Sequence, residues 1–78
     1  MDNRQEFIDI VAQYSNVSAE EMTDDMRFRE DLGFSSLDFM SFLGELEDQF
    51  DVDIEQESAL QVHTIGEALK MLEELQEA

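Results

Sequence analysis

The segment between Ser35 and Phe50 has the clearest helical pattern of the chain and restricts its fold more than any other feature. Apolar side chains recur there at i, i+3, i+4, i+7 and i+11: Phe39, Phe42, Leu43, Leu46 and Phe50. This spacing puts them on one face of an amphipathic helix, which is stable mainly when that face is buried against other elements. Ser35 and Asp38 have the S-x-x-D spacing of a capping box, and Gly33 permits a tight turn before it. A core-facing helix beginning at Ser35 is therefore predicted.

Two more segments have the same periodicity, and a fourth is short. One amphipathic helix is predicted from Asn3 to about Ser15–Asn16, with Asn3 as its N-cap and Glu6 completing a variant of the capping box. Another begins after Thr64, where Glu67 completes a further capping box. A brief helical turn is expected around residues 56–60. The chain has no proline and only three glycines, which suits helices. We predict an all-α fold for residues 1–78, a single domain built as a small four-helix bundle with three longer helices and one short one.

A long connection, residues 17–34, joins the first and second predicted helices. A loop of this length without any structure is uncommon inside a compact domain. Apolar residues recur along it: Val17, Met22, Met26, Phe28 and Leu32. We expect these side chains to attach the connection to the core.

Charge excludes several kinds of partner. The chain has 21 acidic and four basic residues, a net charge of −17. Such a surface repels nucleic acid and anionic membranes and favours partners with basic patches. No segment approaches the roughly 18 apolar residues of a membrane span, and the first residues lack the pattern of a signal peptide. We expect a cytoplasmic monomer with no nucleic-acid partner and no stable membrane insertion.

The residue types of a metal centre are scarce. The chain has no cysteine and one histidine, His63, so it cannot assemble a zinc site. An EF-hand loop beginning at Asp51 would need glycine and glutamate where Gln56 and Val62 stand. Nucleophilic catalysis by a serine would need an adjacent base and an oxyanion hole, which this pattern does not provide. We predict no metal site and no enzymatic activity.

Ser36 is the residue that the predicted second helix presents at its first turn. Free backbone N–H groups and the helix dipole favour a negative group there, such as a phosphate. Leu37 and Met40 are apolar residues on the side of this helix that faces away from the core stripe, with acids around them, as in a docking site. Spacing alone favours a simpler interpretation, in which Ser35 and Ser36 are a capping pair and the two apolar residues complete the core.

The segments "DLGFSSLDF", "LGELEDQFDVDI" and "TIGEALKML" resemble the acyl carrier protein family, which has a D-L-G-x-D-S-L motif. The similarity runs from about Phe7 to Leu75. It implies that a phosphopantetheinyl transferase attaches 4'-phosphopantetheine from coenzyme A to Ser36 through a phosphodiester. The thiol of that arm then carries acyl groups as thioesters, so the chain needs no cysteine of its own. Ser36 is thus acted on and does not itself catalyse a reaction.

The resemblance also suggests surfaces for partners and for the acyl chain. Docking to enzymes with basic patches, such as a ketosynthase, an acyltransferase or an acyl-ACP synthetase, is expected to use Asp31, Leu37, Asp38, Met40, Glu45, Glu47 and Asp48. The acyl chain is expected to enter the bundle interior among Phe28, Phe39, Phe42, Leu46, Ile54, Val62 and Ile65. Fatty-acid, polyketide and related lipid pathways are all compatible with this assignment.

Three positions depart from the family's pattern. Ser35 stands where an aspartate is usual, Ser41 replaces an acid, and Gly44 replaces a larger apolar residue. These changes favour a specialised carrier. Two alternatives stay open: a peptidyl or D-alanyl carrier that bears aminoacyl groups on the same arm, and an acidic helical adaptor without any cofactor.

Overall fold

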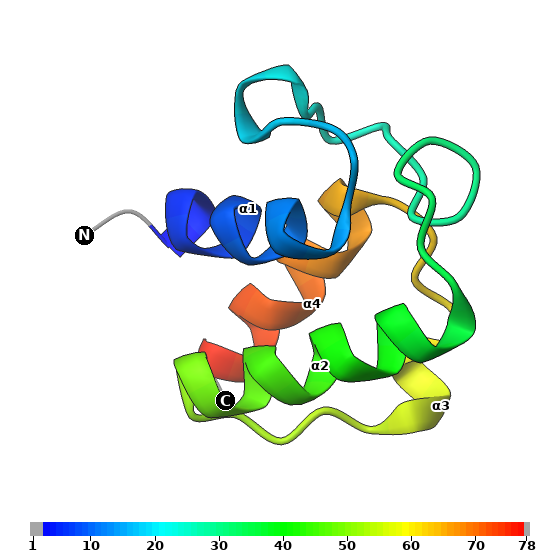
Figure 1. Ribbon diagram of the computed structural model, residues 1–78. Coiled ribbons are helices and arrows are strands. Elements are labelled where there is room, and N and C mark those ends of the chain that lie inside the picture. The colour runs from blue at the N-terminus through cyan, green and yellow to red at the C-terminus, as the bar shows by residue number, and fades with distance from the viewer. Residues whose placement is uncertain (1–2, 78) are drawn as a thin grey trace.

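The computed structural model describes residues 3–77, which fold into four α-helices and one 3-10 helix. In chain order these are α1 (Asn3–Tyr14), η1 (Ala19–Glu21), α2 (Ser36–Phe50), α3 (Gln56–Ala59) and α4 (Ile65–Glu77). No strand occurs among them, only an isolated antiparallel bridge between Arg27 and Thr64. The predicted all-α class, with three longer helices, one short one and a long first connection, is confirmed. Figure 1 shows α1 and α2 running in opposite directions, with α4 behind them and α3 at the end where α2 begins.

Helix α2 begins as its sequence predicts. Ser35 is the N-cap: its hydroxyl oxygen accepts a hydrogen bond from the Asp38 N–H at 3.1 Å, and the Asp38 carboxylate accepts one from the Ser35 N–H at 3.0 Å. Such a reciprocal cap contributes about 1 kcal/mol. Gly33 adopts a φ of +76°, a conformation that glycine takes without strain, and so turns the chain into the helix. Asp51, at φ 54°, ends the helix in the left-handed conformation.

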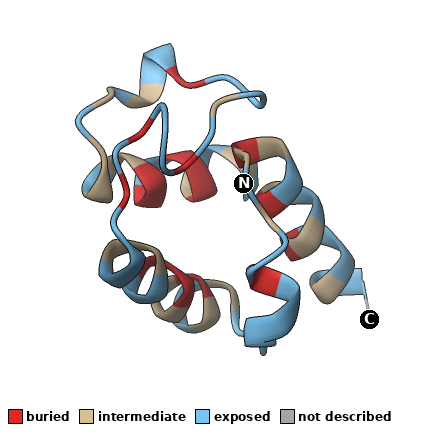
Figure 2. Cartoon of the chain, turned by 90° about the vertical axis from the view of Figure 1, so that its right-hand side faces the viewer, coloured by how far each residue is buried: buried red, intermediate tan, exposed pale blue. Residues whose placement is uncertain are grey.

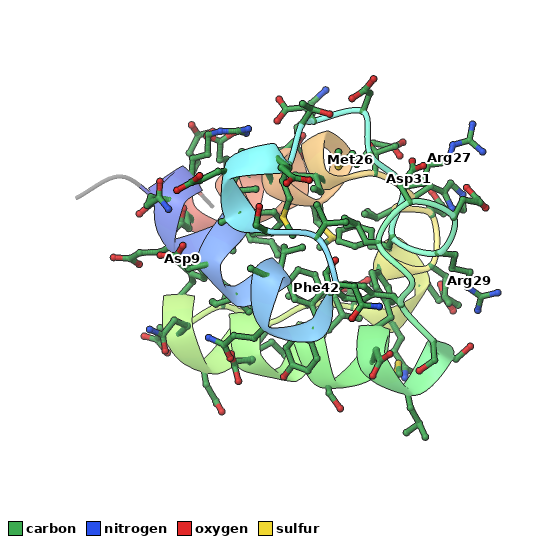
Figure 3. The ribbon with its side chains drawn as sticks, turned by 45° about the horizontal axis from the view of Figure 1, so that its top comes forward. Asp9, Met26, Arg27, Arg29, Asp31 and Phe42 are labelled. Atoms are coloured by element: carbon green, nitrogen blue, oxygen red, sulfur yellow. The ribbon has the colours of Figure 1, made fainter. Side chains whose placement is uncertain are left out.

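The core lies where α1, α2, α4 and the long connection meet. Phe7 and Phe42 are fully buried and their rings pack edge to face with centroids 5.7 Å apart. Burying side chains of this size contributes about 1.5–3 kcal/mol each. Figure 2 shows the buried positions of the helices turned toward this common interior, and Phe42 lies inside it in Figure 3. The buried set is Phe7, Ile8, Ile10, Val11, Met22, Phe28, Leu32, Phe34, Phe42, Leu43, Leu46, Ala59, Ile65, Ala68 and Leu72.

The connection between α1 and α2 is attached to this core, as expected. Met22, Phe28 and Leu32 are buried, and Val17 and Met26 are half-buried against them. The segment also pairs with the start of α4, since the Phe28 N–H donates to the His63 carbonyl at 3.0 Å. Ser18 precedes the short helix η1 but makes no side-chain cap hydrogen bond.

Asn3, which the sequence suggests as an N-cap, is itself helical, as the first described residue of α1. The Asn3 side chain donates to the Gln76 side chain at 3.0 Å, near the end of α4. Within residues 3–77, no helix combines the length and apolar character that crossing a membrane requires, and no group of acidic and histidine side chains is arranged to hold a metal ion.

Candidate functional site

Ser36 is the first residue of α2, and its side chain is exposed. The capping bonds use the neighbouring Ser35, which leaves the Ser36 hydroxyl outside the cap. The N–H groups of Ser36 and Leu37 have no acceptor within residues 3–77. Unpaired N–H groups at a helix start attract negative groups through their partial charges and the helix dipole. The helix therefore presents a hydroxyl in a position that favours a phosphate ester.

Arg29 is a site residue that the sequence analysis did not identify. Its Nη2 donates a hydrogen bond to the Ser36 Oγ over 2.8 Å, across seven residues of chain. Figure 3 shows Arg27, Arg29 and Asp31 together at the end of the molecule where the long connection approaches α2. The segment between residues 29 and 36 is neither helix nor strand, so only the folded loop brings these two side chains together.

A pocket of about 570 Å³ lies beside Ser36, between α2, α3 and the long connection. Ser36 and Arg29 both line it, and His63 and Thr64 contribute polar groups. Its apolar lining consists of Phe28, Phe34, Phe39, Met40, Ala59, Leu60 and Val62. A mostly apolar pocket with a few polar groups is typical of a small-molecule site.

Three of the residues predicted to contact an acyl chain line this pocket: Phe28, Phe39 and Val62. Phe42, Leu46 and Ile65 instead have no exposed surface and belong to the core, while Ile54 is half-buried. None of these four lines the pocket. The contact of all seven with an acyl chain stays a prediction.

Large apolar side chains are exposed around the pocket. Leu37 is 78% exposed and Met40 44%, in agreement with the expected docking face. Leu60, just after α3, is 70% exposed and was not predicted. Its signal was weak, because a single leucine in a short irregular segment has no periodic partners. We call these three exposed residues, two on α2 and one just after α3, the apolar rim.

Most of the predicted docking acids also make bonds inside the chain. The Asp31 carboxylate accepts from the Arg27 N–H at 2.8 Å, and Asp38 belongs to the cap. The Glu47 carboxylate accepts from the Ile54 N–H at 2.9 Å, which holds the segment after α2. Asp48 is exposed and makes no side-chain bond within the described chain. Their contribution to docking stays a prediction, but Asp48 can be changed with the least effect on folding.

Glu45 is half-buried and accepts a weak hydrogen bond from the Tyr14 hydroxyl at 3.4 Å. Desolvation and the nearby Glu45 charge raise the pKa of Tyr14 above its ordinary value. Tyr14 therefore stays protonated under neutral conditions and can keep donating. Glu45 thus links α2 to α1, and its role in docking stays a prediction.

Glu67, in the first turn of α4, also lines the pocket. Its carboxylate accepts from the His63 N–H at 3.1 Å, and from the Thr64 N–H and hydroxyl at 3.2 Å each. The hydrogen bond from His63 is the largest cause of a lowered pKa for Glu67, and the bonds from Thr64 add to it. The predicted capping box at Thr64 is confirmed.

Two of the three departures from the family's pattern, Ser41 and Gly44, do not change the fold. Ser41 is exposed on α2. A Cβ atom built on Gly44 would meet no other atom within 4 Å, so no close packing inside the chain requires glycine there. The departure at Ser35 preserves the cap and removes one carboxylate beside Ser36.

Comparison with known proteins gives one family match. The family model described as a phosphopantetheine attachment site matches residues 5–72. An acyl carrier protein from Enterococcus faecalis has a similar structure with a TM-score of 0.81 at 29% identity, covering 92% of this chain and 91% of that one. The hexanoyl acyl carrier protein of the actinorhodin polyketide synthase from Streptomyces coelicolor matches with a TM-score of 0.76 at 26% identity, covering 99% and 90%.

Proposed function

This chain belongs to the phosphopantetheine attachment site family of acyl carrier proteins, and we propose that it carries acyl intermediates on a 4'-phosphopantetheine arm attached to Ser36. Members of this family are carriers and not enzymes. The thiol of the arm supplies the chemistry, because it holds an acyl group as a thioester. The exposed Ser36 hydroxyl beside an apolar pocket is the observation that carries the assignment to this residue.

The residues around Ser36 suit a phosphodiester. The hydroxyl is exposed to a modifying transferase, and the N–H groups of Ser36 and Leu37 are unpaired within the described chain. Arg29 adds a cation at hydrogen-bond distance from the ester oxygen. Hydrogen bonds to a charged phosphate are about twice as strong as those between neutral groups. The chain's own residues thus provide attachment, neutralisation and an adjacent pocket.

We propose that partner enzymes dock on the apolar rim and the acids near it. Exposed apolar residues next to charged groups are typical of a docking site, and the net charge of −17 steers basic partners toward it. The expected partners are a phosphopantetheinyl transferase and the acyl-transferring enzymes of fatty-acid, polyketide or related lipid biosynthesis. Asp48→Lys should slow transfer to such an enzyme without changing the unfolding transition, and an unchanged transfer rate would remove Asp48 from the interface.

The attachment is tested by intact mass after incubation with coenzyme A and a broad-specificity transferase. The wild-type chain should gain the mass of one phosphopantetheine, and Ser36→Ala should gain nothing. Ser41→Ala is the matched control, because Ser41 is another exposed serine of α2, and it should load like the wild type. A chain that stays unmodified beside a control carrier that is modified would favour the acidic adaptor. Loading of Ser36→Ala would move the attachment site elsewhere.

A further inference from the structure

Arg29 is the cation of this acidic chain that contacts Ser36. The sequence has only four lysines and arginines against 21 acids. Arg4 pairs with Asp24 and Arg27 with Glu30. Within residues 3–77 neither Arg29 nor Lys70 forms an ion pair, but Arg29 also donates a hydrogen bond to the neutral Ser36 hydroxyl. A guanidinium surrounded by so many carboxylates that pairs with none of them is available for a different anion.

We propose that Arg29 binds the phosphate of the arm on Ser36 and thereby fixes the first bonds of the arm beside the pocket. This inference rests on the proposed function, since it requires the arm to be attached at Ser36. It adds a positioning residue outside the D-L-G motif. The phosphate would be bonded to the same Oγ atom that Arg29 contacts at 2.8 Å, so the guanidinium needs no large movement to reach it.

The charges near Ser36 favour this role. A phosphodiester adds one negative charge to a surface that already has Glu30, Asp31 and Asp38 close in sequence. Ser35 stands where an aspartate is usual in the family and so lacks one carboxylate. Arg29 supplies a positive charge on the same side. Guanidinium groups match phosphate oxygens with parallel N–H donors, which gives direction as well as attraction.

The arrangement also has a consequence for the arm. Arg29 and Ser36 line the same pocket, together with apolar residues of α2, α3 and the connection. A phosphate held between Arg29 and the start of α2 loses rotational freedom at the Ser36 end of the arm. The remainder of the arm then starts beside the pocket. With an unrestrained phosphate, the arm would be mobile in solvent. Because Arg29 is exposed, salt should weaken the contact.

The test uses the loaded protein and its phosphorus signal. The 31P chemical shift of the folded, loaded wild type should differ from that of the same protein unfolded in urea. Arg29→Gln should lose most of this difference, and high NaCl should reduce it in the wild type. Arg27→Gln is the matched control, since it removes the same charge from the same loop but from a side chain paired with Glu30. It should keep most of the difference, and Arg29→Lys should keep part of it.

Two further readouts follow the guanidinium and the arm directly, the first in the wild type and the second in Arg29→Gln. The Arg29 Nε–Hε signal in a 15N spectrum should move on conversion from unloaded to loaded protein, and more than that of Arg27. With labelled arm amides, the 1H–15N nuclear Overhauser effect should fall in Arg29→Gln, reporting a more mobile arm.

Failure of this inference is distinct from failure of the proposed function. A wild-type chain that gains no mass overturns both. A loaded chain whose 31P shift, Arg29 signal and arm mobility are indifferent to Arg29 overturns this inference alone. Slower loading of Arg29→Gln with an unchanged 31P shift would also overturn it, because Arg29 would then act on the transferase and not on the arm.

Discussion

Helices α2 and α4 both begin with a capping box, but the residue after the cap is exposed in α2 and buried in α4. Ser35 with Asp38 starts α2, and Thr64 with Glu67 starts α4. After the cap, α4 continues with Ile65, which has no exposed surface. Helix α2 continues with Ser36, which is exposed. A capping box therefore fixes where a helix begins, while the next residue decides whether that beginning is buried or presented.

The first two backbone N–H groups of each helix also differ: those of α4 are hydrogen-bonded and, within the described residues, those of α2 are not. In α4 the Ile65 N–H donates to the Met26 carbonyl at 3.0 Å, and the Gly66 N–H donates to the Asp24 carbonyl at 2.9 Å. The long connection thus satisfies donors that a helix start leaves unpaired. In α2 the corresponding donors, on Ser36 and Leu37, have no acceptor within residues 3–77. The chain itself pairs the donors at the start of α4, whereas those at the start of α2 stay unpaired within the described residues.

The largest expected difference is at the residue after each cap. Ile65→Ala should lower the free energy of unfolding by about 2–5 kcal/mol, because it removes fully buried methylene groups and leaves a cavity. Ser36→Ala should change it by less than about 0.5 kcal/mol, as is usual for an exposed position. Urea unfolding followed by circular dichroism measures both. Ile65→Val, with an expected cost of about 0.5–1.5 kcal/mol, serves if Ile65→Ala does not fold. Equal losses in the free energy of unfolding for Ser36→Ala and Ile65→Ala would contradict the distinction between an exposed and a buried helix start.

The caps themselves should behave alike. Ser35→Ala and Thr64→Ala should each lower the free energy of unfolding by about 0.5–2 kcal/mol, because each leaves an N–H of its first turn without its side-chain acceptor. The same urea measurement applies. Ser35→Asp keeps an acceptor at the cap and should be close to the wild type. If only one of the two variants lowered the free energy of unfolding, the two caps would not contribute equally to stability.

The smallest expected effect is a pH dependence at the α4 cap. The pKa of Glu67 is lowered in the folded state, chiefly by the hydrogen bond from the His63 N–H. Its stabilising contribution is therefore present above the ordinary glutamate pKa, about 4.3, and is lost as the pH falls through the lowered folded value. Glu67→Gln should flatten the fall of the melting temperature in that window. Thr64→Ala, which keeps the bond from His63, should flatten it less. An unchanged pH profile in Glu67→Gln would contradict this account.

The fold was largely predictable because its signals are local. The spacing of Ser35 and Asp38 fixed the start of α2, and Thr64 with Glu67 did the same for α4. Apolar periodicity then gave the buried faces. The first turn of α1 shows the limit of this approach, because Asn3 is helical and bonds to Gln76 at the far end of the chain. The sequence around an asparagine is the same whether its side chain caps a helix or contacts another helix, so the pattern could not separate the two.

The site was predictable only where it overlaps a motif. Ser36 and Leu37 follow from the motif, but the contact of Arg29 with Ser36 depends on how an irregular loop folds. The pocket lining had a different difficulty. Phe39 lines the pocket and Phe42 lies in the core, yet both are phenylalanines on neighbouring positions of one apolar stripe. Local pattern does not separate a residue that fills the interior from one that borders a cavity.

The aromatic cluster behind the pocket has a practical consequence. The ring of Phe28 lies 5.2 Å from Phe34, 5.3 Å from Phe39 and 5.5 Å from Phe42, measured between centroids. Three of these four rings also line the pocket. Circulating π-electrons displace the resonances of protons held near a ring face or edge. An acyl chain that enters beside Ser36 would therefore shift the methyl NMR signals of Val62, and its own signals would be shifted by the rings. These ring-current shifts would report directly whether the pocket is occupied.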